Sequence, residues 1–254
     1  MLRPRIIPCL LIQNGGLVKT NQFIDPKYVG DPINAVKIFN EKEVDELVVL
    51  DIDATVNNYA PNYELIAKLA AECRMPLCYG GGVKNVDQVQ KIIGLGVEKV
   101  ALSSSAVKDP ELISRASELV GSQSVVVVID VKKVGIFKRY EIYTHNGKKA
   151  TGIDPIDFAK AAQDFGAGEL VVNSIDRDGQ MSGYDYDLIS KIRSSIAIPM
   201  TALGGAGSLD DIKKLISQHH IIGAAAGSLF VFKGKYRAVL INYPSRHEKF
   251  KLFI

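Results

Sequence analysis

Residues 46–53, with the sequence ELVVLDID, recur 123 positions later as residues 169–176, with the sequence ELVVNSID. The match continues without gaps, so that residues 31–93 align onto residues 154–216. A chain that repeats a buried-strand pattern over so long an interval is built from two similar halves. Upstream, residues 5–11 align with residues 124–130, and there the repeat breaks. One of these strands ends on Asp130 and the other on Leu11.

Strand-like runs alternate with helical patterns along the chain and are apolar on both faces, as buried parallel strands are. The predicted strands are residues 5–11, 46–52, 76–80, 98–103, 124–130, 169–174, 199–203 and 221–226. Eight βα units in 254 residues predict a (β/α)8 TIM barrel. A doubly wound open sheet would explain the alternation, but not a two-fold repeat. We expect one domain, residues 1–254, with half-barrels of about 1–122 and 123–254.

Bulk properties exclude several classes of protein. The net charge is only +3, with both signs spread along the chain, which does not indicate a nucleic-acid surface. No apolar run approaches the roughly 18 residues needed to span a bilayer. The three cysteines have no metal-site spacing, and an odd count without a signal peptide favours a reducing cytoplasm. We expect a cytoplasmic protein with no metal or cofactor.

Two segments interrupt the barrel pattern. Residues 12–30, which include Lys19, are too long for an ordinary βα loop and predict a mobile cover of an active site. Residues 131–150 alternate apolar and polar positions and predict a small hairpin after the fifth strand. Both follow strands at the C-terminal face, where barrel enzymes hold their chemistry.

Glycine and serine loops occur twice at the same face. Gly80-Gly81-Gly82 and Gly204-Gly205-Ala206-Gly207 follow the third and seventh strands, and Ser103-Ser104-Ser105 and Gly227-Ser228 follow the fourth and eighth. Glycine lets backbone N–H groups approach an anion, and a helix N-terminus favours negative charge. The duplicated pairing predicts an elongated ligand with a phosphate at each end. The alternative is that the glycines only make tight turns.

Carboxylates also follow the strands. Asp130 ends the fifth strand at the mouth, where a carboxylate can act as general acid or base. Its alternative role is an N-cap, or an ion pair with Lys132 or Lys19. Four other carboxylates lie at strand ends: Asp51, Asp53, Asp176 and Asp178. Some of them are expected to hold loops through Arg177 or backbone amides instead of reacting.

The opposite face carries charges at the starts of four strands: Arg5, Glu46, Lys99 and Glu169. Their alternating signs predict a closed ring of salt bridges at the bottom of the barrel. Such a ring is either a structural plug or a gate into the barrel interior.

Several stretches resemble the HisF family, the cyclase subunit of imidazole glycerol phosphate synthase. They include Arg5-Ile6-Ile7-Pro8-Cys9-Leu10, Gly80-Gly81-Gly82, Ser174-Ile175-Asp176-Arg177-Asp178-Gly179, Ser182-Gly183-Tyr184-Asp185 and Gly204-Gly205-Ala206-Gly207. The resemblance covers residues 1 to about 232.

The resemblance implies a (β/α)8 barrel that binds a bisphosphate ribonucleotide and docks a HisH glutaminase on its N-terminal face. In the family, ammonia then crosses the barrel through a gate, whose residues correspond here to Arg5, Glu46, Lys99 and Glu169. The implied substrate and phosphate residues are Lys19, Gly81, Gly82, Ser103, Ser104, Asp176, Gly179, Gly204, Gly205, Gly227 and Ser228.

The sequence departs from the family at informative places. The family's two catalytic aspartates fall on Asp130 and on Leu11, which cannot transfer a proton. Ser103-Ser104 replace the usual asparagine and threonine, and the tail beyond residue 232 is unlike the usual last helix. The pattern resembles HisF-like paralogues that supply ammonia, with a HisH-like glutaminase, to a sugar amidotransferase of surface-polysaccharide biosynthesis.

Three functions therefore stay open. The first is an ammonia conduit serving an amidotransferase that makes an acetamidino sugar. The second is a genuine cyclase, a lyase of histidine biosynthesis that forms imidazole glycerol phosphate and AICAR. Such a cyclase could use Asp51 or Asp53 beside Asp130. The third is the related sugar isomerase HisA, against which the stretch from Ser174 to Asp185 argues. Whether the chain is itself an enzyme depends on what Leu11 has removed.

Overall fold

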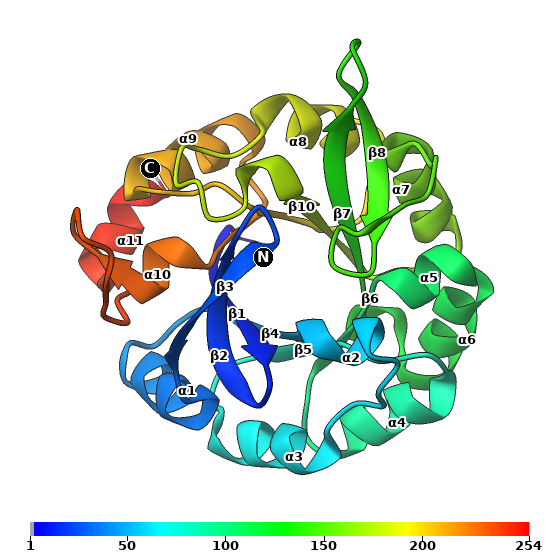
Figure 1. Ribbon diagram of the computed structural model, residues 1–254, viewed down its shortest axis with the longest axis horizontal. Coiled ribbons are helices and arrows are strands. Elements are labelled where there is room, and N and C mark those ends of the chain that lie inside the picture. Colours follow the sequence, from blue (N-terminus) through cyan, green and yellow to red (C-terminus); the bar gives the residue numbers. More distant parts are fainter. Residues whose placement is uncertain (1–2, 254) are drawn as a thin grey trace.

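The structure is a computed structural model that describes residues 3–253. In that range eight parallel strands close into a barrel, in the order β1-β4-β5-β6-β7-β10-β11-β12 and back to β1 (Figure 1). Their bounds are β1 (Arg5–Gln13), β4 (Leu47–Asp51), β5 (Leu77–Gly80), β6 (Lys99–Leu102), β7 (Val125–Val134), β10 (Glu169–Ser174), β11 (Met200–Leu203) and β12 (Gly223–Ala226). The predicted (β/α)8 barrel is confirmed.

Helices surround the barrel and connect its strands. Asp31 and Asp154 cap two of them by accepting hydrogen bonds from backbone amides, and each is followed by a proline in the first turn. The longer helices are α1 (Pro32–Glu41), α3 (Tyr63–Glu72), α4 (Val86–Gly94), α6 (Glu111–Val120), α7 (Pro155–Asp164), α8 (Tyr186–Arg193) and α9 (Leu209–His219). Short helices follow three barrel strands: α2 (Ile52–Val56), α5 (Ser104–Lys108) and α10 (Ser228–Val231).

The strands divide the core into two layers, because successive side chains of a strand point to opposite faces. On β1, Ile6 and Leu10 face the helices, whereas Ile7, Cys9 and Leu11 face the barrel interior. The interior layer is completed by small and branched side chains from the other strands: Val48, Cys78, Ala101, Val126, Val128, Val171, Leu203 and Ala225. The interior between the two faces of the barrel is therefore filled by apolar side chains.

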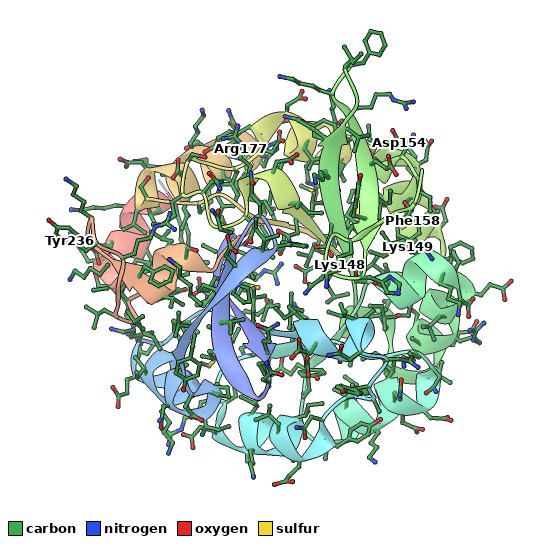
Figure 2. All side chains as sticks on the ribbon, viewed as in Figure 1. Lys148, Lys149, Asp154, Phe158, Arg177 and Tyr236 are labelled. Carbon is green, nitrogen blue, oxygen red and sulfur yellow. The ribbon has the colours of Figure 1, made fainter. Side chains whose placement is uncertain are left out.

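Two antiparallel ribbons extend over the C-terminal face. The segment predicted as a mobile loop is a three-stranded ribbon, because β1 continues to Gln13 and turns into β2 (Gly16–Asn21) and β3 (Ile24–Gly30). The predicted hairpin is confirmed: β7 pairs with β8 (Arg139–Thr144), which is followed by β9 (Lys149–Ala150). Lys148 and Lys149 lie at its inner end (Figure 2).

The last part of the chain departs from the barrel repeat. After α10 it forms a hairpin of β13 (Phe232–Lys233) and β14 (Ala238–Val239), whose Tyr236 points away from the barrel (Figure 2). It then returns to the barrel and ends in α11 (Arg246–Leu252), which packs beside α9. Within residues 3–253, none of the helices combines the length and apolar character needed to cross a bilayer.

Candidate functional site

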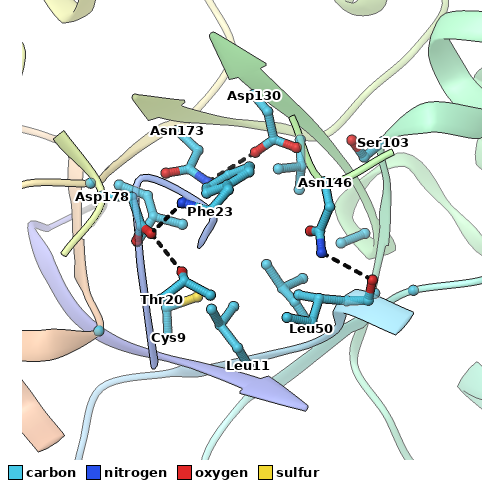
Figure 3. Close-up of a pocket in the computed structure, with 18 of the residues that line it drawn as sticks. Cys9, Leu11, Thr20, Phe23, Leu50, Ser103, Asp130, Asn146, Asn173 and Asp178 are labelled. Atoms are coloured by element: carbon cyan, nitrogen blue, oxygen red, sulfur yellow. Dashed lines mark hydrogen bonds between the residues drawn. The ribbon is translucent and has the colours of Figure 1, made fainter. Parts of the chain in front are cut away.

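The mouth of the barrel at its C-terminal face holds a cavity of about 120 Å³ (Figure 3). This volume is slightly smaller than the roughly 150 Å³ that holds benzene in an engineered protein core. The ribbon of β2 and β3 covers it, since Lys19, Thr20 and Phe23 line the cavity.

One side of the cavity is polar. Asp130, on β7, accepts a hydrogen bond at Oδ1 from Nδ2 of Asn173 on β10, at 2.9 Å (Figure 3). Burial raises the pKa of Asp130 to about 7; the hydrogen bond from Asn173 lowers it, and the negative charge of Asp178 raises it further. A carboxyl group with this pKa exchanges a proton readily at neutral pH. The alternative partners predicted for it, Lys132 and Lys19, do not form ion pairs with it among the described residues.

The opposite side is apolar. Leu11 and Leu50 lie across the cavity from Asp130 (Figure 3), and Leu203 also lines it. Leu11 is buried among the interior residues, with an exposed fraction of 9%. It pairs with Val18 of the covering ribbon and with Leu50 of β4. No proton-transfer group therefore stands at the end of β1.

Asn173 was not predicted from the sequence. Its Oδ1 atom is buried and has no hydrogen-bond partner among the described residues, so this oxygen is available to a donor in the cavity. The signal that could have found it is the internal repeat. Asn173 corresponds to Leu50, which is the same kind of polar-to-apolar mismatch that distinguishes Asp130 from Leu11.

The other strand-end aspartates hold the loops, as expected, but through backbone amides and side chains other than Arg177. Asp178 accepts hydrogen bonds from Thr20 Oγ1 at 2.6 Å and from the Phe23 amide at 3.3 Å, which fastens the ribbon. Asp51 caps α2 by accepting from the amides of Asp53 and Ala54, and burial raises the pKa of Asp51.

Two further aspartates complete the set of loop contacts. Asp53 accepts from the Asn14 amide at 2.7 Å, and Asp176 accepts from the Lys133 amide at 2.8 Å. Asp176 does not line the cavity. Arg177 instead donates to the Ser182 hydroxyl, at 3.2 Å.

The predicted glycine and serine loops meet around the cavity. Lining residues from them are Gly81, Gly82, Ser103, Ser104, Gly204, Gly205, Gly227 and Ser228, and Gly179 also lines the cavity. Gly81 has φ +122°, and a side chain there would overlap the Asp51 carbonyl oxygen. At Gly227 a methyl group would overlap the ammonium nitrogen of Lys19, so this buried cation lies directly against the loop after β12.

At the N-terminal face the four predicted charges form a closed ring. Arg5 forms ion pairs with Glu46 and, at 2.7 Å, with Glu169. Lys99 forms pairs with Glu46 at 2.8 Å and with Glu169 at 2.9 Å. Thr201 also donates to Glu169, at 2.6 Å. The two cations hold the pKa of Glu169 at about 2, below its usual value, in spite of its burial.

The ring and the mouth lie at opposite ends of one barrel. Comparison of the sequence with known proteins identifies the family to which the chain belongs. Residues 5–237 match the histidine biosynthesis protein family. The whole chain is 58% identical, over 253 residues, to all of a Leptospira interrogans protein provisionally named imidazole glycerol phosphate synthase subunit HisF. The chain belongs to the HisF family.

Two other relatives carry numbered names of the same kind. A protein of Vibrio vulnificus strain YJ016, provisionally named subunit hisF3, is 57% identical over 99% of this chain and 96% of its own length. A protein of Pseudomonas aeruginosa, provisionally named subunit hisF2, is 52% identical over 96% and 97%.

Proposed function

We propose that this HisF-family chain is an ammonia conduit. It receives ammonia from a HisH-like glutaminase at the N-terminal face and releases it at the C-terminal face. The proposed acceptor is a sugar amidotransferase of surface-polysaccharide biosynthesis, which uses the ammonia to make an acetamidino sugar. The observation that carries the proposal is the contrast between the two ends of the barrel, where the ring is closed and Leu11 stands opposite Asp130.

The apolar interior of the barrel suits a neutral molecule. Between the ring and the mouth it consists of side chains such as Ile7, Val48 and Val171. Ammonia can pass among such side chains as NH₃, whereas NH₄⁺ would lose its hydration without gaining a partner, at a cost of many kcal/mol. The cavity at the mouth, at about 120 Å³, accommodates a molecule of this size without movement of the ribbon.

The ring would act as the gate. It is closed by four ion pairs, so a molecule can pass only when one side chain turns aside. Lys99 is suited to this movement, because a lysine is a flexible point charge, whereas Arg5 holds Glu169 through a rigid guanidinium fork. Movement of Lys99 alone leaves both glutamates paired with Arg5.

The alternative function is a genuine cyclase of histidine biosynthesis. The pKa of Asp130, at about 7, suits general acid–base chemistry, and in this function the glycine loops and Lys19, which lies against Gly227, would hold phosphate. Against this function, Leu11 supplies neither a second proton-transfer group nor a charge opposite Asp130. We therefore propose that the phosphate loops persist around a site whose proton-transfer pair is broken.

A single comparison tests the two functions. The purified chain with its HisH-like glutaminase is given glutamine and the bisphosphate ribonucleotide, and formation of imidazole glycerol phosphate is followed. The conduit predicts no appreciable product, with glutamine still hydrolysed. Turnover near that of ordinary cyclases would overturn it.

A matched pair of variants sharpens the result. Leu11→Asp places a carboxylate across the cavity from Asp130 and should raise cyclase turnover measurably, since a positioned acid or base contributes about 10²–10⁴-fold. Leu50→Asp places the same group in the same apolar wall but not at the end of β1, and should give no gain.

The reducing cytoplasm is the compartment we propose, and the three cysteines are free.

A further inference from the structure

The tail, residues 240–253, is fastened to the barrel by an ordered set of contacts. The amides of Leu240 and Asn242 donate to the carbonyls of Val231 and Phe230, at 2.8 and 2.9 Å. Helix α11 then begins at a capping box, in which Ser245 and Glu248 satisfy each other's backbone amides. Its Leu252 is buried in the core. The tail is therefore a fixed part of the surface.

The tail meets the barrel beside the ring. Tyr243 donates to the carbonyl of Ile6 at 2.8 Å and accepts from the amide of Asp45 at 3.2 Å. Lys249 forms an ion pair with Asp45 at 2.9 Å, in a nearly buried position. Asp45 immediately precedes Glu46 of the ring and also accepts from the Ile6 amide, at 2.9 Å. Helix α11 is therefore held against the N-terminal ends of β1 and β4.

Helix α11 leaves an apolar and basic surface open to solvent. Phe250 is 65% exposed although the helix around it is fixed. Arg246 is exposed too, and its only carboxylate partner among the described residues is Glu43, at 2.7 Å. The helix carries four basic residues, counting His247, against one acidic residue. An exposed aromatic side chain beside an arginine, on a rigid support, is the composition of an interface anchor.

The ring determines which partner would cover this surface. A stable interface buries about 800 Å² per partner, which corresponds to a disc of roughly 16 Å radius. Lys249 of α11 forms an ion pair with Asp45, the residue next to Glu46 of the ring, so α11 lies beside the ring. A glutaminase centred on the ring would therefore extend over α11.

We propose that α11 is a docking element for the glutaminase, with Phe250 entering an apolar pocket of that partner and Arg246 facing acidic side chains on the rim of the pocket. This inference rests on the proposed function, because it takes the glutaminase to be the ammonia donor at the ring. It adds a contact outside the ring, in the part of the chain that follows the family match at residue 237.

Binding of the purified HisH-like glutaminase tests the proposal by isothermal titration calorimetry. Phe250→Ser and Arg246→Glu should each weaken binding at least tenfold. The controls are Phe137→Ser and Arg139→Glu, which change the same residue types on the β7–β8 hairpin of the C-terminal face. Phe137 is 89% exposed, and both control variants should bind within twofold of the unmodified chain.

The outcomes separate the two levels of the argument. If the unmodified chain does not bind the glutaminase, the proposed function fails. If it binds and both α11 variants also bind within twofold, or if the Phe137→Ser control loses as much affinity as Phe250→Ser, only the docking role of α11 is overturned. Urea unfolding of each variant verifies that the fold is kept, which the exposure of both side chains leads us to expect.

Discussion

Removal of one cation from the ring should destabilise the barrel strongly. In Lys99→Met the two buried glutamates share Arg5 alone, and their side chains are only 4% and 6% exposed. Breaking a buried ion pair by removing one partner costs about 3–5 kcal/mol. The pKa shift of Glu169, to which Arg5 contributes more than Lys99, sets a ceiling of the same order for this one carboxylate. The fall of this pKa from 4.5 to about 2 corresponds to about 3 kcal/mol, at roughly 1.4 kcal/mol for each tenfold change in proton affinity.

The sign of the pH dependence follows from the same shift. Because the folded pKa of Glu169 lies below its unfolded value, its stabilising contribution is complete above about pH 4.5 and is lost as the pH falls toward 2. Arg5 and Thr201 still hold Glu169 in Lys99→Met, so the variant loses only the part of this contribution that Lys99 supplies. The difference in free energy of unfolding between the unmodified chain and Lys99→Met should therefore be about 3 kcal/mol at pH 7 and shrink steadily below pH 4.5.

Urea unfolding at a series of pH values measures this difference. The matched control is Lys68→Met, which removes an exposed i,i+4 pair with Glu64 on α3 and should leave the free energy of unfolding nearly unchanged. If Lys99→Met costs no more than Lys68→Met at pH 7, or if its cost does not shrink in acid, the ring is not the buried and mutually paired cluster described above.

Three further predictions concern the mouth. Asn173→Leu should raise the pKa of Asp130 above about 7, because it removes a hydrogen bond that favours the carboxylate; a ¹³C NMR titration that shows no rise would contradict this. Gly81→Ala should lower the free energy of unfolding in urea by about 1–3 kcal/mol, since it forces a side chain into φ +122° and onto the carbonyl of Asp51; an unchanged midpoint would contradict it. Asp178→Ala removes two hydrogen bonds that hold the ribbon and should reduce the hydrogen-exchange protection of residues 16–30. The reduction should be about tenfold for each 1.4 kcal/mol of local stability that is lost, and protection elsewhere should be unchanged.

Much of the fold was predictable because parallel strands are apolar on both faces and because the chain repeats itself. All eight barrel strands lie where the sequence placed them, and Asp31 caps α1 as expected. Residues 12–30 were predicted as a loop, because the ribbon carries little alternation of its own. Its strands form through pairing with the extension of β1 and through Asp178, which is 158 residues from Thr20 in sequence, and a local pattern does not contain such contacts.

The site was predictable only to the extent that it lies at strand ends. The ring follows from four charges placed at strand starts, and a barrel brings strand starts together. Asn173 was missed because asparagine at a strand end has no distinctive sequence signature, and its importance comes from the contact with Asp130. The hydrogen bond between Tyr243 and Asp45 also joins residues far apart in the chain, so no local motif indicates it.

One strand connects the ring to the mouth. β10 begins with Glu169, continues through Val171 and carries Asn173 four residues later, which is a rise of about 13 Å. It is hydrogen-bonded on both sides, to β7 and β11, so its backbone cannot lengthen or slide without breaking the barrel. Events at the two ends can therefore be linked only by side-chain rotation or by a molecule moving between them. Side-chain rotation takes picoseconds to nanoseconds where it is not hindered, so the barrel can work as a static frame around a fast and local movement.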